Sequence, residues 1–113
     1  MSTISTHVLD TARGVPAEGV PITLDRLTPE GWQRLTAGVT NDDGRVRDFL
    51  PAGTILEPGT WRMAFDTRAY FDRHGVEGFY PYVHVVFELR RGGQHTHVPL
   101  LLSPFGYSTY RGS

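Results

Sequence analysis

The sequence predicts an all-β fold, a Greek-key sandwich of two sheets that carries one short helix. Several short segments alternate between apolar and polar residues, which is the pattern of strands with one buried face. The chain has 113 residues, including 13 Gly and 8 Pro, which suits short strands joined by tight turns. A hydrophobic share of 39% and a net charge of −1 exclude a disordered chain, since disorder needs low hydrophobicity or high net charge. We therefore expect residues 1–113 to form a single domain.

Two segments, 61–66 and 82–89, show the alternation most clearly. In both, large apolar residues occupy every second position, so that one face of each strand would lie in the core. The opposite face of the second segment carries Tyr82, His84, Val86 and Glu88. Weaker strand candidates span residues 7–10, 21–27, 33–40 and 95–102.

Residues 67–75 break the alternation and predict a helix of about two turns. Asp66 or Thr67 can cap its amino end, because a short polar side chain accepts a hydrogen bond from a free backbone N–H. Gly75 suits the left-handed position that follows many helices.

Composition excludes several classes of partner. Lys and Arg number 11 against 12 Asp and Glu, without the basic excess that nucleic-acid binding needs. No apolar run approaches the length of about 18–20 residues that spans a bilayer, so we expect no membrane segment. The first residues have neither a basic region nor an apolar region of a secretory signal, and we expect a cytoplasmic protein. The chain contains no Cys, which excludes disulfides and thiolate metal sites.

Histidines form the most notable polar pattern. His95 and His97 lie two apart on a predicted strand and would project from the same face, and we expect His84 on a neighbouring strand. Three interpretations stay open: ordinary surface histidines, a metal site, or a catalytic site in which a neutral imidazole takes a proton from water. Spacing alone does not choose among them.

Two further features invite a functional interpretation. Arg45 follows a hairpin-type turn, Asn-Asp-Asp-Gly at 41–44, where an arginine is ordinarily solvated. The last residues, 107–113, are aromatic and contain neither Lys nor Glu, which is unusual for a free end. We expect this end to be pinned to a sheet or a pocket.

Three signatures resemble those of the transthyretin-related 5-hydroxyisourate hydrolases. They are STHVLD at 5–10, GVTNDDGR at 38–45 and HTHVPLLLSPFGYSTYRGS at 95–113. The segment FDTRAYF at 65–71 is also similar to the strand-to-helix junction of the family. The match spans essentially the whole chain, and the final Tyr-Arg-Gly-Ser is its most specific element, since it separates the hydrolases from transthyretin itself. Thr96 and Phe105 depart from the family, which commonly has Tyr at both positions.

The resemblance implies a transthyretin-like sandwich that assembles as a homotetramer, with active sites where two dimers face each other. It implies hydrolysis of 5-hydroxyisourate to 2-oxo-4-hydroxy-4-carboxy-5-ureidoimidazoline in urate degradation, with no metal or organic cofactor. Carried over by position, the catalytic set is His7, Arg45, His97 and Ser113. Substrate contacts are expected from His7, Arg45, Tyr110 and Arg111.

This assignment agrees with the chemistry of the residues. His7 or His97 could take the proton of the attacking water, and the sequence does not say which. Arg45 would stabilise the charge that develops on the attacked carbonyl oxygen. We also hypothesise that Ser113 orients one of the imidazoles. The alternatives are a non-catalytic small-molecule carrier on the same fold, a structural β-sandwich module and a His-based metallohydrolase.

Overall fold

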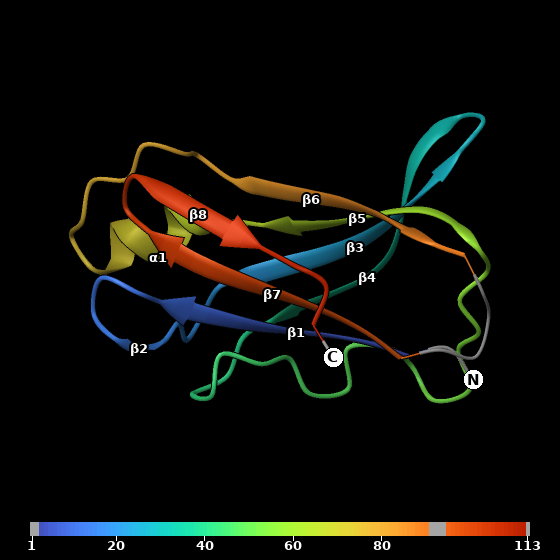
Figure 1. The fold of residues 1–113 in the computed structure, drawn as a ribbon, viewed down its shortest axis with the longest axis horizontal. Helices are drawn as coiled ribbons and strands as arrows, with labels where there is room; N and C mark the ends of the chain where they lie inside the picture. Colours follow the sequence, from blue (N-terminus) through green and yellow to red (C-terminus); the bar gives the residue numbers. More distant parts are fainter. Residues whose placement is uncertain (1–2, 91–94, 113) are drawn as a thin grey trace.

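The computed structural model describes residues 3–90 and 95–112, which form two packed four-stranded sheets (Figure 1). The first sheet has the order β2-β1-β7-β8, with bounds Val15–Pro16, Thr3–Asp10, His95–Ser103 and Gly106–Thr109. The second sheet has the order β4-β3-β5-β6, with bounds Gly31–Val39, Pro21–Thr28, Gly59–Phe65 and Val83–Leu89. One short helix, α1 (Thr67–Arg73), follows β5 at one end of the sandwich. The predicted two-sheet sandwich with a short helix is confirmed.

The core lies between the sheets and comes from the alternation seen in the sequence. On β1, Ile4 and Val8 are buried while Ser5 and His7 are only half-buried, so that the strand turns its even-numbered residues inward. On β5 the buried residues are Trp61, Met63 and Phe65, as predicted. Burial of side chains of this size contributes about 1.5–3 kcal/mol each, which is what holds the two sheets together.

The pairing of β1 with β7 positions the functional residues. These strands run parallel, although their sequences lie about 90 residues apart, and Ser5 stands opposite His97 in the register. All other neighbours in both sheets are antiparallel. The amino-terminal strand therefore lies in the middle of the first sheet, beside the strand that carries His95 and His97.

One expectation about strand neighbours is wrong. His84 lies on β6, at the edge of the second sheet, whereas His95 and His97 lie on β7 of the first sheet. The side chain of His84 faces outward from the second sheet and stacks on Tyr82 with ring centroids 4.5 Å apart. Periodicity identified the strand and its faces, but it contains no information about which sheet a strand joins.

The helix has the ends that the sequence predicts. The carboxylate of Asp66 accepts a hydrogen bond from the N–H of Ala69 at 3.1 Å, and Gly75 adopts φ +66° just beyond the last turn. Tyr70 is buried and donates from its hydroxyl to the carboxylate of Asp10 at 2.7 Å, which ties α1 to the end of β1. In the described part of the chain no helix is long and apolar enough to cross a membrane.

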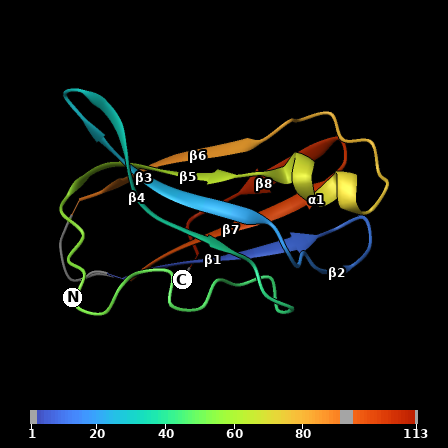
Figure 2. The same cartoon turned by 180° about the vertical axis from the view of Figure 1, so that it is seen from behind.

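Figure 2 shows the outer side of the second sheet. The β3–β4 hairpin projects beyond the sandwich at the end opposite α1 (Figure 2). The loop between β4 and β5 passes along the side of β1 (Figure 2). Its first residues include Arg45, whose guanidinium lies 3.5 Å from Nδ1 of His7 on the first sheet.

Candidate active site

The outer face of the first sheet carries a row of polar side chains from two parallel strands. Ser5 and His7 project from β1, and His95 and His97 project from β7, because residues of the same parity share a face. The hydroxyl oxygen of Ser5 lies 2.8 Å from Nδ1 of His97 and 2.9 Å from Nε2 of His95. The prediction that His95 and His97 share a face is confirmed.

Arg45 reaches this face through a tight turn that is bound to β1. The side chain of Asn41 accepts hydrogen bonds from the N–H groups of Asp43 and Arg45, at 2.9 and 3.1 Å. The carbonyl of Gly44 accepts from the N–H of Val8 at 2.8 Å. As a result, the guanidinium of Arg45 donates to Nδ1 of His7 over a distance of 3.5 Å.

Gly44 is required for this approach in two ways. Its φ of +74° is one that side chains rarely adopt, and an added Cβ would overlap the backbone carbonyl of Val8. A β-carbon there would also lie 3.3 Å from the imidazole of His7. Glycine therefore allows the turn to lie directly on the strand that carries His7.

The C-terminal segment folds back over His97. Gly112 forms an isolated antiparallel bridge with His97, and its N–H donates to the carbonyl of His97 at 2.8 Å. A Cβ on Gly112 would overlap the imidazole ring of His97. The expectation that this end is pinned is confirmed for its described residues.

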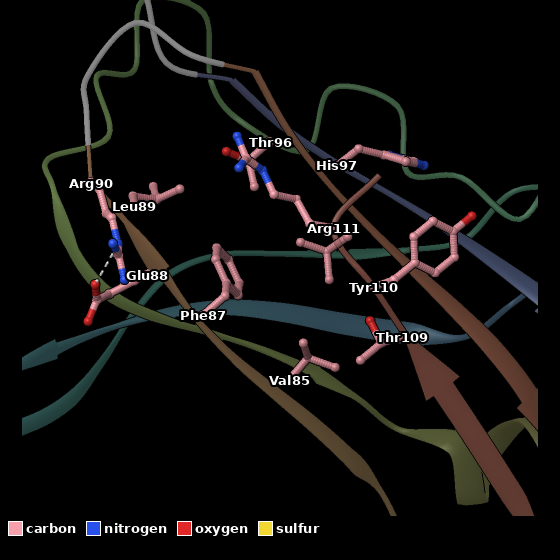
Figure 3. A pocket seen from close by; sticks show the side chains of 11 residues that line it. Val85, Phe87, Glu88, Leu89, Arg90, Thr96, His97, Thr109, Tyr110 and Arg111 are labelled. Carbon is pink, nitrogen blue, oxygen red and sulfur yellow. Dashed lines mark hydrogen bonds and ion pairs between the residues drawn. The ribbon is translucent and has the colours of Figure 1, made fainter. Parts of the chain in front are cut away.

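Tyr110 and Arg111 lie on opposite faces of the C-terminal segment. Figure 3 shows the ring of Tyr110 directed to the side of His97, whereas the guanidinium of Arg111 is directed toward Thr96. A groove of about 660 Å³ opens between β6 and this segment, and Phe87, Leu89 and Arg111 help to line it. His97 and Tyr110 line the same groove, so that Tyr110 lies beside the imidazole while Arg111 extends toward Thr96.

Electrostatics favour a neutral His97. Burial lowers the pKa of its imidazole, and the positive charge of Arg45 lowers that pKa further, followed by smaller contributions from His95 and His7. His97 is therefore mostly uncharged near neutral pH and able to accept a proton. Among residues 3–90 and 95–112, no three His, Asp or Glu side chains lie close enough to hold a metal ion.

His7, Arg45 and His97 thus meet on one sheet face, with Tyr110 beside them. Ser113 lies outside the described residues. Sequence reasoning missed Ser5 as a contact of His97. Ser5 and His7 are two residues apart in the 5–10 signature, so their side chains share one face of the strand. This spacing could have identified Ser5 as a neighbour of the site.

Fold and site together define a transthyretin-type β-sandwich with two imidazoles and a guanidinium on the outer face of one sheet. The chain belongs to the HIUase/Transthyretin family, whose sequence model matches residues 4–112.

Individual relatives agree with this membership. A 5-hydroxyisourate hydrolase of Mus musculus is 49% identical over 114 residues, which cover 99% of this chain and 96% of that protein. The structure of Klebsiella pneumoniae 5-hydroxyisourate hydrolase superposes with a TM-score of 0.85 at 40% identity, covering 100% of this chain and 94% of the other. Sea bream transthyretin in complex with thyroxine superposes with a TM-score of 0.89 at 32% identity, covering 96% and 93%.

Proposed function

We propose that this chain is a 5-hydroxyisourate hydrolase, which opens the six-membered ring of its substrate to give 2-oxo-4-hydroxy-4-carboxy-5-ureidoimidazoline. The observation that carries the proposal is the meeting of His7, Arg45 and His97 on one sheet face, beneath the C-terminal segment. The names of relatives that are 42–49% identical over nearly the whole chain support the same substrate.

His97 is the general base in this proposal. Its lowered pKa keeps the imidazole neutral, and its Nδ1 already contacts Ser5, which leaves Nε2 for the attacking water. His97 removes a proton from water, the oxygen bonds to a ring carbonyl carbon, and the bond from that carbon to the ring nitrogen breaks. The carbonyl carbon becomes the new carboxyl group, and the leaving nitrogen takes a proton.

His7 and Arg45 act together as donors. A guanidinium has only N–H donors, so Nδ1 of His7 accepts the contact from Arg45 and the proton of a neutral His7 stands on Nε2. His7 is then suited to donate a hydrogen bond to the substrate rather than to act as a base. Arg45 stabilises the negative charge on the attacked carbonyl oxygen, and one well-placed donor of this kind lowers a barrier by about 3–4 kcal/mol.

We also propose a homotetramer, a dimer of dimers with the sites between the dimers. Support comes from the side of the sandwich where β6 and β8 form the edges of their sheets, because unpaired strand edges recruit further strands. Nearby, the loop before β6 and the β7–β8 turn expose an aromatic cluster with Tyr80 and Tyr107 at 5.0 Å. Phe79 packs on Tyr80 in this cluster, and Phe105 on the β7–β8 turn is exposed as well. A cytoplasmic location stays a prediction.

An ultraviolet assay of freshly generated 5-hydroxyisourate tests the proposed activity. The protein should speed loss of the substrate far above the spontaneous rate, and prior chelation should leave the rate unchanged if no metal takes part. Saturable binding of the compound without acceleration would overturn the proposal and favour a carrier of the transthyretin kind.

A further inference from the structure

Next to the cluster of His7, Arg45 and His97, a row of hydrogen bonds crosses the same sheet face. The hydroxyl oxygen of Thr3 lies 2.6 Å from Nδ1 of His95, and Nε2 of His95 lies 2.9 Å from the hydroxyl oxygen of Ser5. The same Ser5 oxygen lies 2.8 Å from Nδ1 of His97. Thr3, His95, Ser5 and His97 thus form one unbranched chain, which we call the hydroxyl–imidazole relay.

Proton counting allows this relay only two complete arrangements. Each hydroxyl and each neutral imidazole carries one proton, so every link needs a donor on one side and an acceptor on the other. In the first arrangement, His97 donates from Nδ1 to Ser5, Ser5 donates to Nε2 of His95, and His95 donates from Nδ1 to Thr3. In the second, every donor becomes an acceptor, and the proton of His97 stands on Nε2.

The two arrangements differ in what His97 can do. In the first, Nε2 of His97 has a free lone pair and can take a proton from water. In the second, Nε2 already carries a proton, and Nδ1 is occupied by the hydroxyl of Ser5. Only the first arrangement gives a working base.

The four residues of the relay lie on the paired strands β1 and β7. Thr3 faces His95 and Ser5 faces His97 in the parallel β1–β7 register, so that hydroxyls and imidazoles alternate across the two strands. Backbone hydrogen bonds between central strands hold these positions more tightly than a loop would.

We propose that Ser5 and His95 are positioning residues, which hold His97 as the Nδ1–H tautomer so that its Nε2 can act as the base. This inference rests on the proposed hydrolase function and deepens it. It assigns to Ser5 the orienting role that the sequence suggested for Ser113, since the hydroxyl of Ser5 contacts Nδ1 of His97.

A set of variants tests the relay by its pattern of losses. Ser5→Ala should lower kcat about 10- to 100-fold with little change in KM, the range typical when a group that orients a functional imidazole is removed. Ser5→Thr keeps the hydroxyl and should recover most of the rate. His95→Phe should lower kcat less than Ser5→Ala does. The double variant Ser5→Ala/His95→Phe should have the same kcat as Ser5→Ala, because without the Ser5 hydroxyl the imidazole of His95 no longer contacts His97 through it. Thr60→Val, which removes a hydroxyl from the outer face of the second sheet, is the matched control.

Two further readouts separate positioning from a merely structural role. Nitrogen NMR of labelled histidine should find the His97 proton on Nδ1 in the wild type and a mixture of tautomers in Ser5→Ala. The acid limb of the pH–rate profile should also move to lower pH in Ser5→Ala, because the imidazolium loses the hydroxyl of Ser5 as a partner and keeps only the Ser5 backbone hydrogen bond, which raises its pKa. The charged or titratable groups beside His97, namely Arg45, His95, His7 and Tyr110, are unchanged in that variant.

Full kcat in Ser5→Ala, or a wild-type proton on Nε2 of His97, would overturn the relay. If the wild type is active and Ser5→Ala has the same kcat, the relay is refuted, whereas the hydrolase proposal is not affected. If the wild type does not accelerate loss of 5-hydroxyisourate, the hydrolase proposal fails, and the NMR comparison still decides whether Ser5 sets the tautomer.

Discussion

At the scale of single residues, the two imidazoles of the site differ in their surroundings. Arg45 donates to Nδ1 of His7, whereas Ser5 contacts Nδ1 of His97. Nδ1 of each ring is therefore engaged by the protein. Among residues 3–90 and 95–112 no hydrogen bond reaches Nε2 of His7 or of His97, and we expect these nitrogens to face water or substrate. The same kind of side chain can then serve as a hydrogen-bond donor at one position and as a base at the other.

The pH dependence follows from the state of His97. Burial and the charge of Arg45 lower its pKa below the usual value of about 6.5, and the base must be neutral to act. We expect kcat to be constant above neutral pH and to fall only when the pH drops below about 6.5, through the lowered pKa. Steady-state rates measured from pH 5 to 8 check this, and a midpoint above 7 would contradict the assignment of His97.

At the scale of elements, the 41–45 turn places Arg45, and Gly44 lets the turn touch β1. Gly44→Ala should lower both stability and activity, because its Cβ would overlap the carbonyl of Val8 and displace the turn. Thermal unfolding and the hydrolase rate measure the two effects.

Gly14→Ala is the matched control for this turn. Gly14 has a similar φ of +70° but open space around its Cβ position. The Gly14→Ala variant should lose about 1 kcal/mol of stability, because alanine rarely adopts this positive φ, and should keep its activity. Equal loss of activity in both variants would show that strain, and not contact with β1, is responsible.

The C-terminal segment is the second element that shapes the site. Gly112→Ala should lower kcat while leaving the melting temperature nearly unchanged, because the new methyl group pushes against the ring of His97 at the end of the chain. Gly106→Ala is the control, since its Cβ would meet only the hydroxyl of Ser103 at 3.7 Å. Wild-type kcat in Gly112→Ala would mean that His97 works without this close contact.

The sequence predicted the local features of the strands and of the helix but not the pairing of distant strands. A period of two predicted that His95 and His97 share a face, and the residues at the ends of α1 predicted its limits, because both features are local. The parallel pairing of β1 with β7 joins residues about 90 positions apart, and no local pattern encodes it. For this reason His84 was expected beside the wrong strand, and the contact of Ser5 with His97 was missed.

At the scale of the whole molecule, the proposed site is a surface rather than an internal cavity. The cluster lies on an outer sheet face, and the groove beside it opens along the β6 edge. A second copy would close such a site, which is why the proposed assembly and the proposed activity are linked.

The assembly can be tested at the β6 edge. Val86→Arg replaces an exposed residue of that strand and should shift the protein from tetramers to smaller species with a parallel loss of activity. Val39→Arg changes an equally exposed valine on β4, at the other edge of the same sheet, and should leave assembly and activity unchanged. Light scattering at several concentrations measures the mass, and a fully active wild-type monomer would contradict the shared site.

We have proposed that His97 is the general base of a 5-hydroxyisourate hydrolase. The most direct test is the initial rate of loss of freshly generated 5-hydroxyisourate with the wild type, His97→Asn and the Thr60→Val control. We predict that the wild type and the control react equally fast and that His97→Asn is slower by about 10²–10⁴-fold, the usual contribution of a general base. A folded His97→Asn protein that reacts as fast as the wild type would show that His97 is not the general base.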